Sequence, residues 1–108
     1  MDNLLNQAKQ FLSIVETSTL KDEEIKLLIS SAILELERSG IDTEYNYSKD
    51  DEKYDDLITT AIMFYVKSNF GNVDIKEKEY ALRTFNTLEQ SLSLSGGYRK
   101  KSESLWLQ

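Results

Sequence analysis

The chain carries no charged side chain from Leu57 to Val66, although 30% of its residues are charged. The apolar positions between residues 57 and 70 cover most of a helix circumference at 100° per residue, and a helix that is apolar nearly all round is buried. The segment is too short to span a bilayer, which takes about 20 apolar residues. We therefore expect a central hub helix over Leu57–Phe70. A central β-strand is the alternative, because β-branched and aromatic residues are frequent here. The length of the segment, the acidic residues before it and Gly71 after it favour a helix.

Two earlier segments repeat apolar residues at helical spacing. Asp2 or Asn3 is suited to cap the first helix. Its apolar face is expected to consist of Leu4, Leu5, Ala8, Phe11 and Leu12, with Lys9 and Gln10 off that face. This helix is short and would be marginal alone, so it is expected to dock on the rest of the chain.

The second segment begins with three carboxylates, Asp22 to Glu24, which suit the positive end of a helix dipole. Its apolar stripe is Ile25, Leu28, Ile29, Ala32, Ile33 and Leu36. Leu27 and Leu34 widen this stripe, which predicts contacts with two neighbouring elements. Leu20 is expected to act as an apolar staple before the helix. Gly40 suits the left-handed position after its last turn, with Ile41 making the accompanying apolar contact.

A polar and acidic loop is expected over Ile41–Lys53. Asp50, Asp51 and Glu52 at its end are expected to form the first turn of the hub helix. Three tyrosines, Tyr45, Tyr47 and Tyr54, allow two interpretations: a binding surface, or rings that lie over the hub helix with their hydroxyls in water.

Asp74 to Glu77 has the spacing of a capping box and opens a last helix with Ala81, Phe85, Leu88 and Leu92 on its apolar face. Ser91 to Ser95 then alternates with period two, which is typical of a strand. Gly96-Gly97 interrupts the pattern, and the only basic cluster, Tyr98 to Lys101, precedes a terminus with Leu105-Trp106-Leu107. We predict an all-α domain of four to five short helices over residues 1–94, and an extended or flexible C-terminal tail over residues 95–108.

Composition narrows the possible chemistry. The chain has no Cys and no His, so it lacks thiolate metal ligands, the usual zinc ligand and the usual general base. No EF-hand or P-loop spacing is present, and no pair of acids is placed in an apolar pocket. We expect no catalytic residue, no cofactor and no metal site, hence no enzyme. The formal net charge of −6 argues against a general nucleic-acid binder. The first residues show no signal peptide, which favours synthesis in a cytoplasm.

The order of these elements resembles the small head-tail connector (head-completion or adaptor) proteins of tailed bacteriophages. The likeness begins with the run LLNQAKQFL from Leu4 and the acidic start at Asp22 that leads into a Leu/Ile-rich helix. It continues with Asp56-Leu57 and AIMFYVK from Ala61, and ends with a final helix that leads into a Leu-Ser-Leu-Ser tail. It covers roughly residues 2 to 98.

The resemblance implies a structural virion protein at the head-tail interface, made in the bacterial host cytoplasm. It implies an oligomeric ring, in the virion a dodecamer, that docks on the portal protein and on a stopper or tail-completion protein. DNA would pass through the lumen without sequence-specific binding, and no membrane is involved. The alternative is a small helical DNA-packaging or regulatory adaptor that binds DNA or a packaging partner, with Lys76, Lys78 and Arg83 as its best candidate contacts.

Sequence character rather than matched motifs suggests which residues meet partners. The loop tyrosines, the serine-leucine segment and the basic tail are the candidates. The predicted interface residues are Tyr45, Tyr47, Leu92, Leu94, Gly96, Gly97, Tyr98, Arg99, Lys100, Lys101 and Trp106.

Overall fold

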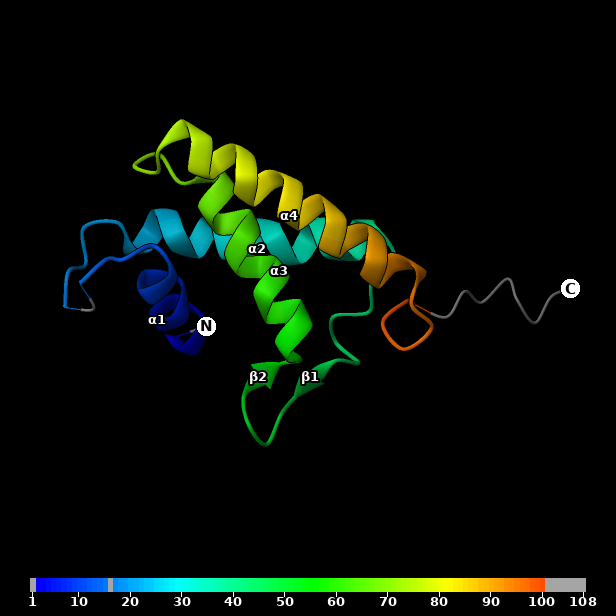
Figure 1. Cartoon of the computed structure of the whole chain (residues 1–108). Helices are drawn as coiled ribbons and strands as arrows, with labels where there is room; N and C mark the ends of the chain where they lie inside the picture. Colours follow the sequence, from blue (N-terminus) through cyan, green and yellow to red (C-terminus); the bar gives the residue numbers. More distant parts are fainter. Residues whose placement is uncertain (1, 16, 101–108) are drawn as a thin grey trace, which may run out of the picture.

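The computed structural model of the chain describes residues 2–15 and 17–100 (Figure 1). These residues form four helices and one short hairpin: α1 (Asp2–Phe11), α2 (Asp22–Arg38), β1 (Tyr47–Ser48), β2 (Lys53–Tyr54), α3 (Asp56–Asn69) and α4 (Ile75–Leu94). The predicted all-α class is confirmed. In the described part of the chain, extended pairing is limited to the hairpin and one isolated bridge.

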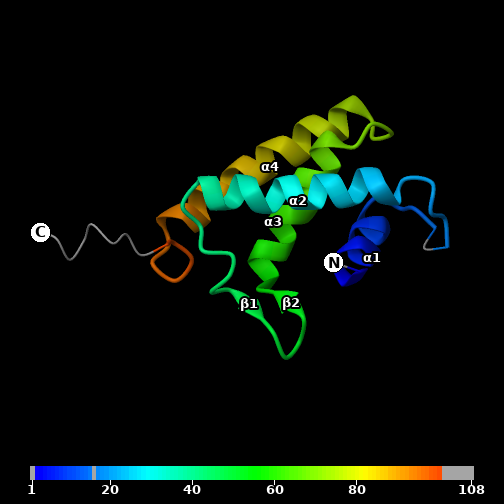
Figure 2. The same cartoon turned by 180° about the vertical axis from the view of Figure 1, so that it is seen from behind.

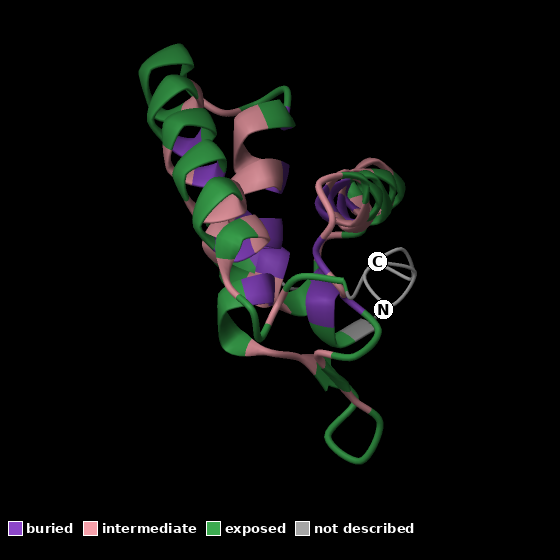
Figure 3. Cartoon of the chain, turned by 90° about the vertical axis from the view of Figure 1, so that its right-hand side faces the viewer, coloured by how far each residue is buried: buried purple, intermediate pink, exposed green. Residues whose placement is uncertain are grey.

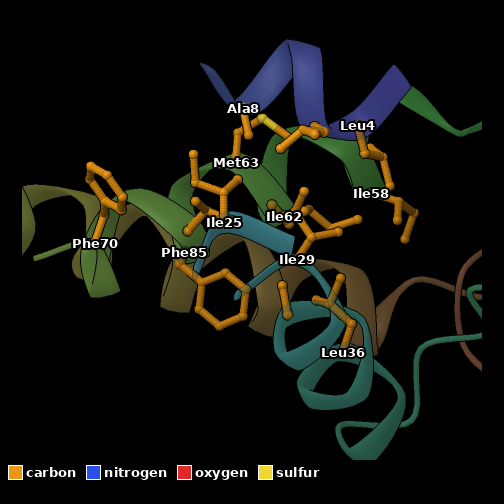
Figure 4. Packing of buried hydrophobic residues seen from close by; sticks show 14 of the residues in the cluster. Leu4, Ala8, Ile25, Ile29, Leu36, Ile58, Ile62, Met63, Phe70 and Phe85 are labelled. Carbon is orange, nitrogen blue, oxygen red and sulfur yellow. The ribbon is translucent and has the colours of Figure 1, made fainter. Parts of the chain in front are cut away.

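Helix α3 is the predicted hub, since it contacts α1, α2 and α4. Ile58, Ala61 and Ile62 have no exposed surface, and Met63 and Val66 are almost completely buried. Figure 4 shows side chains of the other helices converging on those of α3. The β-strand alternative is therefore wrong. The backbone N–H of Leu57 donates to the side chain of Asp55 at 2.9 Å, so the cap residue lies just before the first helical residue.

Helix α2 buries Ile25, Ile29, Ala32 and Leu36. It ends in a Schellman motif: Gly40 has φ +90°, its N–H donates to the Glu37 carbonyl, and the N–H of Ile41 donates to the Leu36 carbonyl. Ile41 is completely buried, as predicted.

Helix α2 contacts two neighbours, α1 and α3, as predicted, but Leu27 and Leu34 do not belong to its buried stripe. They are 70% and 66% exposed, because they lie about 180–200° around the helix from Ile25, on the side opposite the core. Leu20 is 91% exposed, so the predicted staple is also absent.

The acidic loop contains the hairpin, in which Tyr47 pairs with Tyr54 and Ser48 with Lys53. Asp50, Asp51 and Glu52 form its tip, and the prediction that they open the hub helix is wrong. Lys53 and Tyr54 pair with β1 in the hairpin and cannot belong to the helix. Asp55, the next residue, caps α3.

Helix α4 begins at the predicted cap, where the side chain of Asp74 accepts from the N–H of Lys76 at 3.1 Å. It continues to Leu94, so the strand predicted for Ser91 to Ser95 is wrong. Leu92 is 3% exposed and extends the stripe of Ala81 and Phe85, so burial at helical spacing outweighs the alternating pattern.

Candidate functional site

The segment after α4 folds back onto the linker that follows α2. Ile41 and Arg99 form an antiparallel bridge. The N–H of Asp42 donates to the Tyr98 carbonyl at 2.7 Å, and the N–H of Lys100 donates to the Gly40 carbonyl at 2.6 Å. Residues 95–100 of the predicted tail are thus held against the body of the protein. Residues 101–108 lie outside the described residues, and the predicted domain boundary stays a prediction.

Tyr98 also ties this segment to the start of the hub helix. Its hydroxyl donates to Oδ1 of Asp55 at 2.8 Å, and the same oxygen accepts from the backbone N–H of Leu57. The hydrogen bond to Asp55, together with burial, raises the pKa of the Tyr98 phenol. One carboxylate therefore caps α3 and anchors the C-terminal segment.

Two grooves flank this anchor. The C-terminal groove has a volume of about 450 Å³ and is lined by Asp42, Tyr45, Gly96, Gly97, Arg99 and Lys100. The hairpin groove has a volume of about 430 Å³ and is lined by Tyr45, Asn46, Tyr47, Ser48, Lys53, Tyr54, Asp55 and Asp56. Tyr45 lines both grooves and is 80% exposed. The C-terminal groove contains an exposed tyrosine and an arginine, residue types that are enriched in protein interfaces.

The structure brings together five of the predicted interface residues in the C-terminal groove, from two parts of the chain about fifty residues apart. Leu94, the last residue of α4, is 72% exposed. Leu92 packs in the core instead, and Tyr47 stacks edge-on against Tyr54 with 4.8 Å between ring centroids. Lys101 and Trp106 lie outside the described residues.

Sequence reasoning missed two exposed apolar faces. Leu27 and Leu34 form one on α2, and Ile75 and Leu82 form another on α4, where they are 69% and 49% exposed. Figure 3 shows exposed residues along the outward sides of both helices and buried residues between the helices. Helical-wheel positions opposite the core stripe were the signal that could have identified the α2 face.

A group of charged side chains joins α2 to α4. The guanidinium of Arg38 donates to both carboxylate oxygens of Glu35, and its contact with Glu35 Oε2 is 2.7 Å. The Ser39 hydroxyl donates to Glu89 Oε2 at 2.6 Å. The hydrogen bond from Arg38 lowers the pKa of Glu35, whereas burial raises the pKa of Glu89, and nearby Glu35 adds to this increase.

We expect Glu89→Gln to stabilise the protein at neutral pH. The raised pKa means that the folded state binds the Glu89 proton more tightly than the unfolded state does. The stability that protonated Glu89 contributes is therefore fully present below pH 4.5 and is lost as the pH rises through the folded-state pKa. The variant should therefore melt a few degrees higher than the wild type at pH 7, and the difference should shrink towards pH 4. Thermal melts at both pH values measure it, with exposed Glu79→Gln as the control. A variant that is less stable at pH 7 would contradict this account.

Among the described residues, no three or more side chains of His, Cys, Asp and Glu gather in a way that could hold a metal ion. The helices in the same part of the chain include none with the length and apolar character needed to cross a membrane.

Exposed apolar faces are one kind of surface through which proteins bind one another. The family model of phage connector proteins matches residues 4–99, and the chain belongs to this family. No curated protein and no solved structure matches the chain.

Membership in this family gives the chain a structural role in a phage and makes other phage head and tail proteins its partners. It also places the chain in the virion. The resemblance drawn from the order of the helices is confirmed.

Proposed function

We propose that the chain forms an oligomeric ring, a dodecamer in the virion, between the portal and the tail, with DNA passing through its lumen. The observation that carries this proposal is the family match over residues 4–99, which includes nearly all of α1 and the whole of every other described helix. The portal protein and a stopper or tail-completion protein are the proposed neighbours. Synthesis takes place in the cytoplasm of the bacterial host, and the chain has no catalytic activity.

The charge of the chain supports passage of DNA without binding. The chain carries 19 acidic and 13 basic residues. Three consecutive carboxylates, Asp50, Asp51 and Glu52, are exposed at the hairpin tip. A negatively charged lumen wall repels the phosphates of DNA, so DNA can slide along it.

Distinct exposed surfaces support closure into a ring. A head-to-tail ring needs two different complementary surfaces on each subunit. The C-terminal groove lies at one end of α4, and Ile75 lies at the other end of the same helix. We assign the C-terminal groove to contact with a neighbouring phage protein.

The alternative, a DNA-binding adaptor, gains no support from the structure. Lys76 and Arg83 are exposed on α4, but Glu77 and Glu79 stand among them. Salt-sensitive DNA binding at low salt that is lost in Lys76→Glu would favour the adaptor over the ring.

Light scattering tests the proposal by the solution mass of the purified protein, alone and with the portal protein of the same phage. A ring-sized mass or a stable portal complex is expected. Tyr45→Ser with Arg99→Glu should weaken the association about tenfold, or about 1.4 kcal/mol, because it removes the central aromatic side chain and reverses a charge. Lys21→Glu, an exposed cation outside α4 and outside both grooves, is the control for the charge change. A protein that stays monomeric alone and does not bind the portal protein would overturn the proposal.

A further inference from the structure

The outward face of α2 carries two leucines that no described element covers. Leu27 and Leu34 lie two turns apart on this face, and the exposed Ser30 and Ser31 lie between them. Figure 2 shows α2 crossing in front of α3, with no described element over it. The serine side chains are small, so they leave room for a larger side chain between the two leucines.

The C-terminal segment starts beside this helix. The N–H of Lys100 donates a hydrogen bond to the carbonyl of Gly40. Gly40 lies two residues after Arg38, the last residue of α2. The remaining residues read KSESLWLQ and contain Leu105-Trp106-Leu107, with the single tryptophan of the chain. Burial of three consecutive large apolar side chains lowers the free energy of a chain relative to their exposure to water.

The length of this segment matches the position of the leucines. An extended chain covers about 3.3 Å per residue, so the five residues from Lys100 to Leu105 can span at most about 17 Å and the seven to Leu107 at most about 23 Å. Along α2, at 1.5 Å per residue, Leu34 is about 9 Å from Gly40 and Leu27 about 20 Å. The apolar triplet can therefore reach both leucines of its own chain.

We propose that Leu105-Trp106-Leu107 docks on the outward face of α2 in the same chain, with Trp106 over Ser30 and Ser31 between Leu27 and Leu34. The face is one helix wide. Its exposed large apolar side chains are the two leucines, whereas a stable protein interface buries about 800 Å² per partner, which favours a short segment over a second copy. This inference is independent of the proposed ring.

Tryptophan fluorescence of the full chain tests the docking, because Trp106 is its only tryptophan. The free peptide KSESLWLQ gives the emission of an exposed ring. In the wild type, we expect emission at shorter wavelength and weaker quenching by acrylamide than in the peptide. Leu27→Gln with Leu34→Gln should shift both values to those of the peptide. Ile75→Gln with Leu82→Gln, a matched pair on α4, should leave them at wild-type values.

Both double variants should stay folded, because Gln is a good helix former and the substituted positions are exposed. Circular dichroism checks this for each variant. A wild type whose emission equals that of the peptide would overturn the proposal. The proposal would also be overturned if Trp106 stayed protected from acrylamide in the variant Leu27→Gln with Leu34→Gln. Protection that appears only at high concentration, with a doubled mass in light scattering, would also overturn it and assign the face to a second copy.

Discussion

Ile62→Asp is expected to abolish cooperative folding. Ile62 has no exposed surface and lies in the middle of the hub helix, where its neighbours in the core are apolar. A carboxylate there would lose its hydration without gaining a partner, which costs several kcal/mol even after protonation. A domain of this size has about 5–15 kcal/mol of stability in total. Circular dichroism should therefore show loss of helical signal and no cooperative thermal transition.

Leu57→Asp is the matched control on the same helix. Leu57 is 45% exposed and lies in the first turn, where a carboxylate is favourable near the positive end of the helix dipole. This variant should melt close to the wild type. A cooperative transition in Ile62→Asp would show that the core does not depend on the hub helix.

The helices were predictable because each carries its own apolar stripe. The spacing of Ile25, Ile29 and Leu36 placed α2, and the long uncharged stretch placed α3. Local hydrogen bonds were predictable for the same reason, as Asp74 and Gly40 show. These features depend on residues within a few positions of one another, and a single sequence contains that information.

The errors in the predicted elements had different causes. Leu27 and Leu34 were assigned to the core by residue type, although their place on the helix puts them in water. The alternating Ser91 to Ser95 pattern has a strand period, but burial of Leu92 keeps it helical. The hairpin has only two residues in each strand, too short for a periodic signal.

The candidate site was predictable in content but not in geometry. Tyr45, Arg99 and Lys100 were selected for their chemistry, and they do line one groove. The pairing that brings them together joins Ile41 to Arg99. No local pattern indicates such a contact, because it depends on how α2 and α4 lie against α3.

Lys9→Met is expected to be the second most damaging change. Lys9 was predicted to lie off the apolar face, yet it is only 3% exposed. Its Nζ lies 2.6 Å from Asp22 Oδ1 and donates to the Ser18 carbonyl at 2.6 Å, so it ties α1 to the start of α2. Oδ1 of Asp22 is buried and accepts no hydrogen bond of good geometry. The positive charge of Lys9 balances its negative charge in the ion pair.

Met has nearly the length of Lys and keeps the apolar packing of its stem, so the substitution removes only the ammonium group, with its ion pair to Asp22 and its hydrogen bond to Ser18. It leaves Asp22 without its cation, which costs about 3 kcal/mol for a pair this deeply buried. For a domain of about 100 residues this lowers Tm by about 12–24 °C, measured by thermal melts.

Lys26→Met is the control, because Lys26 pairs with Glu23 at 3.7 Å on the exposed side of α2, where the Glu23 side chain is 90% exposed. Such a pair contributes about 0–1 kcal/mol, so this variant should melt near the wild type. Adding Asp22→Leu to Lys9→Met should restore most of the lost stability, since no unpaired charge then remains buried. If the double variant were as unstable as Lys9→Met alone, the loss would come from the bond to Ser18 and not from the ion pair. Recovery in the double variant would identify charge compensation between α1 and α2 as the reason for a lysine inside the core.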